Sequence, residues 1–134
     1  MDLAYVISQR GTCTRRKVGA VIIDPLTRAV ISTGYNGSLP SAPHCEDVGC
    51  FMQSGHCITT IHAETNAINQ AARNGLNVDG AEIYCTSKPC WNCFKNIIQS
   101  GITRIYYSED YDTSSIPLYS EFLLNNSHIL MEKI

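Results

Sequence analysis

The spacing of apolar and polar positions predicts a chain of alternating helices and strands. Apolar, β-branched runs at 18–24 and 29–34 predict two strands, and the turn-like residues between them indicate an antiparallel hairpin. Apolar residues at positions 3, 6 and 7 predict a short amphipathic helix over 2–10. The pattern further predicts helices at 63–75, 90–101 and 117–126 and strands at 81–87, 103–109 and 128–134.

This order of elements indicates the fold class. After the hairpin, strands alternate with helices, which is typical of parallel strand pairs joined by right-handed crossovers. We therefore expect an α/β fold, a three-layer α/β/α sandwich around a mixed five-stranded sheet, in one domain over residues 1–134. The segment 35–61 has no clear period, and loops of such length inside a domain are usually functional or tied down.

Composition excludes several classes of protein. A hydrophobic content of 44% and a charged content of 16% are ordinary for a globular chain. The formal net charge is −2 and the basic residues are scattered except at 14–17, so we expect no nucleic-acid partner. No apolar run approaches the roughly 20 residues of a membrane span. With no secretory signal at the start, we expect a cytoplasmic protein.

The seven cysteines favour metal binding over disulfides, because their number is odd and no export signal precedes them. Cys90 and Cys93 are spaced to share one helical face, and Pro89 fits a helix start whose dipole favours thiolates. His62, at the start of another predicted helix, supplies a third zinc ligand. Three protein ligands leave one position open, as in catalytic zinc sites.

Glu64 lies two residues from His62 at a different helical angle, so it suits a proton shuttle better than a ligand. Zinc can lower the pKa of a water to about 7 and so create a nucleophile beside it. Separately, these residues could be buried thiols and a polar helix turn, or a redox C-x-x-C pair. Together, H-x-E and P-C-x-x-C are the signature of zinc-dependent nucleobase deaminases, in which water attacks C4 of cytosine and the glutamate relays protons.

Five segments resemble the deoxycytidylate (dCMP) deaminases, particularly their phage and bacterial forms: "VGAVII", "GYNGS", "HAETNAI", "SKPCWNC" and "SGITRIYYSEDYD". The resemblance runs from about Tyr5 to the last predicted strand. It implies the cytidine deaminase-like fold, a homohexamer, and hydrolysis of dCMP to dUMP and ammonia, which supplies dUMP for thymidylate synthesis. If the chain is phage-encoded, like some of the proteins it resembles, we expect it in the host cytoplasm.

The resemblance also implies roles in substrate binding. Arg15 would meet the phosphate, Asn36 the sugar, the backbone of Ala63 the base carbonyl, and Tyr111 would close the pocket as a lid. The alternatives are a solvated surface arginine, a turn residue and a packed loop aromatic.

Members of this family are commonly activated by dCTP and inhibited by dTTP, with Mg as the divalent ion. The resemblance places this effector site at Gly34, Tyr35, Asn36, Gly37 and Ser38. Glycines there would let backbone amides approach phosphates.

A second metal site is predicted among the cysteines outside the regular elements. The candidate ligands are Cys13, Cys45, Cys50 and either His56 or Cys57, a spacing plausible for a closed structural zinc site. Some phage and bacterial relatives carry such a second zinc, with cysteines near positions like 13 and 45. The alternative is a set of free buried thiols.

Two kinds of rival remain open. Another zinc deaminase could act on cytidine, cytosine, guanine or adenosine in transfer RNA; the last needs a basic surface, and a nucleoside enzyme would not need Arg15. A zinc-stapled binding module without chemistry would have a fourth protein ligand beside His62 and no role for Glu64.

Overall fold

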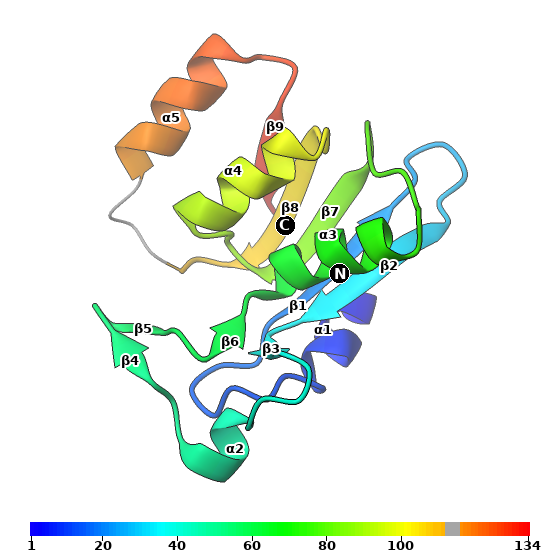
Figure 1. The fold of residues 1–134 in the computed structure, drawn as a ribbon. Coiled ribbons are helices and arrows are strands. Elements are labelled where there is room, and N and C mark those ends of the chain that lie inside the picture. Colours follow the sequence, from blue (N-terminus) through cyan, green and yellow to red (C-terminus); the bar gives the residue numbers. More distant parts are fainter. Residues whose placement is uncertain (112–115) are drawn as a thin grey trace.

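A five-stranded sheet forms the centre of the chain in the computed structural model, which describes residues 1–111 and 116–134 (Figure 1). The strand order is β2-β1-β7-β8-β9. The strands are β1 (Gly19–Ile23), β2 (Val30–Tyr35), β7 (Glu82–Ser87), β8 (Arg104–Glu109) and β9 (Leu130–Lys133). β1 pairs antiparallel with β2 and β7, whereas β7, β8 and β9 are parallel, which confirms the predicted mixed sheet.

The strand order differs in one respect from the simplest expectation. The alternation of strands and helices after the hairpin indicated parallel pairs for the later strands, but β7 pairs antiparallel with β1. β1 lies between β2 and β7, so the connection through α3 joins two strands that run in the same direction without being neighbours.

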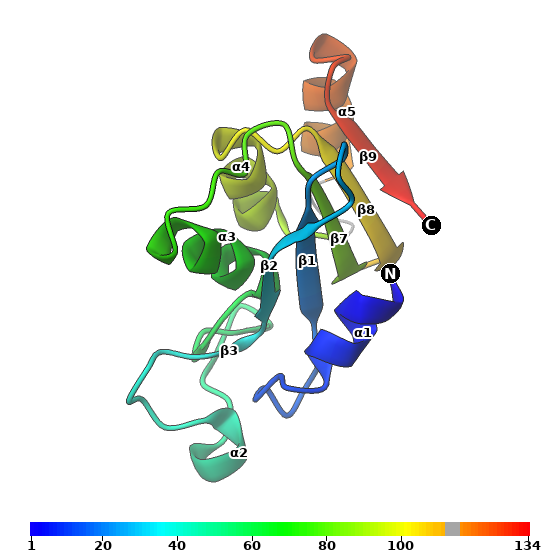
Figure 2. The same ribbon diagram turned by 90° about the vertical axis from the view of Figure 1, so that its right-hand side faces the viewer.

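Helices cover both faces of the sheet (Figure 2). α1 (Asp2–Ser8) lies against one face, and α3 (Ala63–Arg73) and α4 (Trp91–Gln99) lie against the other. α5 (Ile116–Asn125) packs beside α4, where Phe94 makes edge-to-face ring contacts with Tyr119 and Phe122. These main helices and strands end within two residues of the predicted bounds. In the described ranges, no helix is long and apolar enough to cross a bilayer.

The segment without a clear period contains short elements that its sequence did not predict. These are β3 (Gly37–Ser38), α2 (Cys45–Val48), β4 (Met52–Gln53), β5 (His56–Cys57) and β6 (Thr60–Ile61). β3 pairs with β6, and β4 pairs with β5. The segment lies at the end of the sheet where α3 and α4 begin (Figure 1).

Glu82 is a charged residue buried at the opposite end of β7. Only 3% of it is exposed, and its carboxylate accepts hydrogen bonds from Arg104 (2.8 Å), Tyr84 (3.0 Å) and Arg28 (3.1 Å). Burial alone would raise its pKa, but these hydrogen bonds outweigh burial and lower the pKa below its ordinary value of 4.5. The ionised carboxylate therefore stabilises the fold above about pH 4.5, and this contribution is lost as the pH falls through the folded-state pKa.

Glu82→Gln should lower the free energy of unfolding at pH 7 by about 1–3 kcal/mol, because charged donors lose a buried charged acceptor. The difference from wild type should shrink as the pH falls below 4.5. Urea titrations at pH 7 and at acid pH measure both effects. Glu132→Gln, at an exposed position of β9, is the control and should change little. Equal losses in the two variants would contradict a stabilising role for the buried carboxylate.

Candidate active site

The starts of α3 and α4 bring one histidine and two cysteines together. His62 is the N-cap of α3, Cys90 is the N-cap of α4, and Cys93 lies in the first turn of α4. His62 Nδ1 is 3.6 Å from Cys90 Sγ and 3.3 Å from Cys93 Sγ. The expectation that both cysteines share a helical face needs correction: Cys90 has extended backbone just before the helix, and the turn into α4 directs its sulfur toward Cys93.

These three side chains fit a zinc ion. Bond lengths of about 2.3 Å to sulfur and 2.0 Å to nitrogen place tetrahedral ligands roughly 3.5 Å apart, close to both measured distances. Hydrogen bonds from Cys93 and His62 lower the pKa of Cys90 to about 4, while the interaction with Cys90 and burial raise the pKa of Cys93. Cys90 is therefore available as a thiolate at neutral pH. A cation bound to it would favour loss of the Cys93 proton as well.

Glu64 is the second residue of α3 and is 4% exposed. Burial raises its pKa, and this effect exceeds the opposing effects of its own backbone N–H and of the His62 charge. In the described parts of the chain, the group around His62 contains three potential ligand residues, and Glu64 is not one of them. A buried carboxyl with a raised pKa beside such a group suits proton transfer near neutral pH.

One cavity of about 230 Å³ connects these residues with the predicted substrate contacts. Its lining includes His62, Glu64, Cys90 and all four predicted substrate residues, Arg15, Asn36, Ala63 and Tyr111. Ala63 is the first residue of α3, so its N–H has no acceptor within the helix.

The other predicted substrate residues contact neighbouring segments. Arg15 Nη1 donates to the carbonyl of Gly55 at 2.8 Å, at the turn between β4 and β5. The hydroxyl of Tyr111 lies 2.9 Å from His56 Nδ1. The side chain of Asn36 contacts the backbone of residues 16 and 18.

Two basic residues in the cavity lining were not assigned a substrate role from the sequence. Arg16 lies with its guanidinium 5.3 Å from the ring centre of Tyr111 and pairs with Glu109 at 2.5 Å. Lys88 has its ammonium 4.9 Å from the ring centre of Tyr119. Two features of the sequence could have identified them. Arg16 directly follows Arg15, and Lys88 directly precedes the P-C-x-x-C motif.

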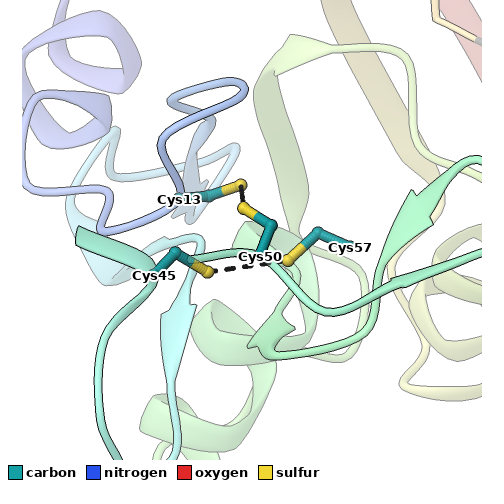
Figure 3. Close-up of side chains that lie close together, drawn as sticks. All are labelled: Cys13, Cys45, Cys50 and Cys57. Atoms are coloured by element: carbon teal, nitrogen blue, oxygen red, sulfur yellow. Dashed lines mark hydrogen bonds between the residues drawn. The ribbon is translucent and has the colours of Figure 1, made fainter. Parts of the chain in front are cut away.

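A second group of sulfurs belongs to four cysteines that lie close together (Figure 3), two of which, Cys13 and Cys57, also line the cavity. The sulfurs of Cys13, Cys45, Cys50 and Cys57 all lie within 4.8 Å of one another. The distances are 3.7 Å from Cys13 to Cys50 and 3.6 Å from Cys45 to Cys57, close to the roughly 3.8 Å of a tetrahedral zinc–thiolate site. Both are far longer than a disulfide bond of about 2.05 Å. The geometry therefore fits a closed four-thiolate zinc site.

Of the two alternatives for the last ligand of that group, the structure brings Cys57 into it. His56 instead lies with its ring against Tyr111. Burial would raise the pKa of Cys57, but hydrogen bonds from the backbone of Thr59 and Thr60 outweigh it and lower the pKa to about 6. A thiol with a lowered pKa is well suited to bind a metal as thiolate.

Comparison with known proteins agrees with this arrangement. Residues 1–109 match the model of the family described as the cytidine and deoxycytidylate deaminase zinc-binding region. The chain belongs to this family. "ComE operon protein 2" of Bacillus subtilis (strain 168) is 43% identical over 134 residues, which are 100% of this chain and 68% of that protein.

Two further similar proteins are named for the deamination of deoxycytidylate. The deoxycytidylate deaminase of Enterobacteria phage T4 is 34% identical over 93% of this chain and 83% of its own length. The crystal structure of dCMP deaminase from the cyanophage S-TIM5, in complex with dCMP and dUMP, has a TM-score of 0.80 and 29% identity. That match covers 99% of this chain and 92% of the cyanophage chain, and it shows that this deaminase has the cytidine deaminase-like fold.

The "GYNGS" segment of this deaminase has a packing role that its sequence did not reveal. A Cβ on Gly34 would lie 2.1 Å from the carbonyl oxygen of Ala63 and 2.4 Å from the backbone nitrogen of Ala67. Gly34 therefore lets α3 approach β2 closely, which fixes the start of α3 and with it His62. Approach of a phosphate is not needed to explain this glycine.

Proposed function

We propose that the chain is a zinc-dependent dCMP deaminase that hydrolyses dCMP to dUMP and ammonia. The observation that carries the proposal is one cavity in which buried Glu64 lies beside the His62, Cys90 and Cys93 group. The names of the phage relatives and the dCMP and dUMP in the cyanophage structure support the substrate.

The residues of the cavity account for the proton transfers of this reaction. A zinc ion held by His62, Cys90 and Cys93 would supply an activated water by lowering its pKa toward about 7. Glu64 accepts the proton of the attacking water and delivers it to N3 of the cytosine ring, while oxygen bonds to C4. Glu64 then transfers the proton of the hydroxyl group on C4 to the amine. The C4–N bond breaks, ammonia departs, and the remaining ring is uracil. The N–H of Ala63, which has no acceptor within α3, is proposed to donate to the base carbonyl.

Arg15 is proposed to bind the 5′-phosphate. It lines the cavity and is exposed, and a guanidinium can form two parallel hydrogen bonds to phosphate oxygens. Arg16 adds a second positive charge to the same cavity. The base would then lie toward Glu64 and the phosphate toward residues 15–16, with Asn36 near the sugar and Tyr111 as a lid.

Ammonia release from cytosine, deoxycytidine, cytidine, CMP and dCMP tests the substrate, and dCMP should give the highest kcat/KM. Arg15→Ala should raise KM for dCMP by about 10- to 100-fold, because a charged hydrogen bond is lost, and change little for deoxycytidine. Lys95→Ala removes an exposed cation of α4 outside the cavity and is the matched control. A wild type that uses deoxycytidine as well as dCMP would belong with the nucleoside deaminases instead.

Regulation by dCTP as activator and dTTP as inhibitor, each with Mg, is proposed for residues 34–38. The support is a direct connection: Gly37 and Ser38 form β3, which pairs with β6, and β6 runs into His62. A ligand that displaced β3 would therefore reach the zinc ligand. In the same assay, dCTP should raise activity at low dCMP and dTTP should suppress it. If the enzyme prefers dCMP but responds to neither dCTP nor dTTP, the substrate proposal stands and the proposed regulation is wrong.

We further propose a homohexamer in the cytoplasm that supplies dUMP for thymidylate synthesis, with no nucleic-acid partner. Exposed apolar side chains in the segment around the four cysteines, Val48, Phe51 and Ile58, support contacts between subunits.

We also propose that the four cysteines hold a second, structural zinc.

A further inference from the structure

Asn36 makes four hydrogen bonds to one loop, residues 12–18. Its side-chain Oδ1 accepts from the Val18 N–H at 2.8 Å, and its Nδ2 donates to the Arg16 carbonyl at 2.7 Å. Its backbone N–H donates to the Val18 carbonyl at 3.1 Å, and its own carbonyl accepts from the Thr12 N–H at 3.0 Å. Only 6% of Asn36 is exposed.

The loop held in this way carries the basic residues of the cavity. Residues 12–18 lie between α1 and β1 and form neither helix nor strand, so the backbone hydrogen bonds of regular secondary structure do not fix their shape. Arg15 and Arg16 both line the cavity, and Asn36 bonds directly to the backbone of Arg16. The loop entry is also packed tightly, since a Cβ on Gly11 would lie 2.6 Å from Asn36 Oδ1.

We propose that Asn36 is a positioning residue for the phosphate-binding loop, and that it sets the preference for a nucleotide over a nucleoside through Arg15 and Arg16. This inference rests on the proposed deamination of dCMP. It goes beyond a contact with the sugar, because that contact alone would affect dCMP and deoxycytidine equally. An amide has a second N–H and a second lone pair, so both roles are compatible.

The physical reason is the cost of leaving buried polar groups without partners. If the Asn36 amide is lost, the Val18 N–H and the Arg16 carbonyl lose their partners, and the loop moves to satisfy them elsewhere. A guanidinium displaced by about 1 Å no longer meets a phosphate whose position is fixed by the base in the cavity.

The decisive variant is Asn36→Asp in the zinc-loaded protein. It keeps the acceptor for the Val18 N–H but places an oxygen against the Arg16 carbonyl. We expect kcat/KM for dCMP to fall about tenfold more than kcat/KM for deoxycytidine, because any loss of a sugar contact affects both substrates and the loss through the arginines affects dCMP alone. Amide hydrogen exchange at Thr12, whose N–H donates to the Asn36 carbonyl from the other end of the loop, should become faster and so report a loosened loop.

Coupling to the arginines provides the second test. In a protein that already carries Arg15→Ala and Arg16→Ala, Asn36→Asp should lower kcat/KM for dCMP no more than kcat/KM for deoxycytidine, because its effect on the phosphate acts through those side chains. Equal losses on dCMP and deoxycytidine, or full additivity with the arginine variants, would overturn the proposal. If Asn36→Asp does not fold, Asn36→Ser provides the same comparison. A wild type inactive on dCMP would instead refute the proposed function itself, before any variant is measured.

Discussion

Glu64→Gln should lower kcat for dCMP by at least about 10²–10⁴-fold while the protein remains folded and keeps its zinc. Glutamine has the size of glutamate but can neither accept the proton of the attacking water nor pass one to the amine. Because burial raises the pKa of Glu64, its ionised form costs stability above its ordinary pKa of 4.5. A neutral side chain at this position should therefore not unfold the chain.

The control for this variant is another buried carboxylate. Glu82→Gln removes a charge of similar burial at the other end of the sheet, outside the cavity. It should lose stability but retain kcat at temperatures where it is folded, the reverse of Glu64→Gln. Steady-state kinetics, zinc analysis and thermal unfolding of the two proteins give the comparison. A Glu64→Gln enzyme with turnover close to wild type would remove Glu64 from the mechanism.

Metal analysis of protein made with ample zinc should find two zinc ions per chain, and Cys45→Ser should reduce the number to one. Structural zinc sites contribute about 10–16 kcal/mol of apparent binding free energy at pH 7, comparable to the whole stability of a small domain. Cys45 holds α2 against this site, so the variant should also melt at a much lower temperature. The remaining zinc should be the one at His62, Cys90 and Cys93.

Cys85→Ala is the matched control for the zinc count. Cys85 is a fully buried thiol of β7 that belongs to neither sulfur group. Its replacement should leave both zinc ions in place and affect stability only through packing. A single zinc in the wild-type protein would show that the four cysteines are free thiols.

The sequence alone was sufficient to predict the mixed five-stranded sheet and the three residues that meet at the starts of α3 and α4. Hydrophobic periodicity is a local property, so it located the main helices and strands to within two residues. The H-x-E and P-C-x-x-C motifs carry their chemistry in residue type and short spacing. For that reason the candidate zinc ligands and the candidate proton shuttle could be chosen before the distances between them were known.

The tertiary structure decided what depends on contacts between distant segments. β1 lies between β2 and β7 in the sheet. The sequence did not predict this order, because strand order depends on how whole faces pack and not on a local pattern. His56 and Cys57 are neighbours in β5, and successive side chains of a strand point to opposite sides, so only the fold could place Cys57 with the other sulfurs. The bonds of Asn36 to residues 16 and 18 likewise join positions whose proximity no local spacing encodes.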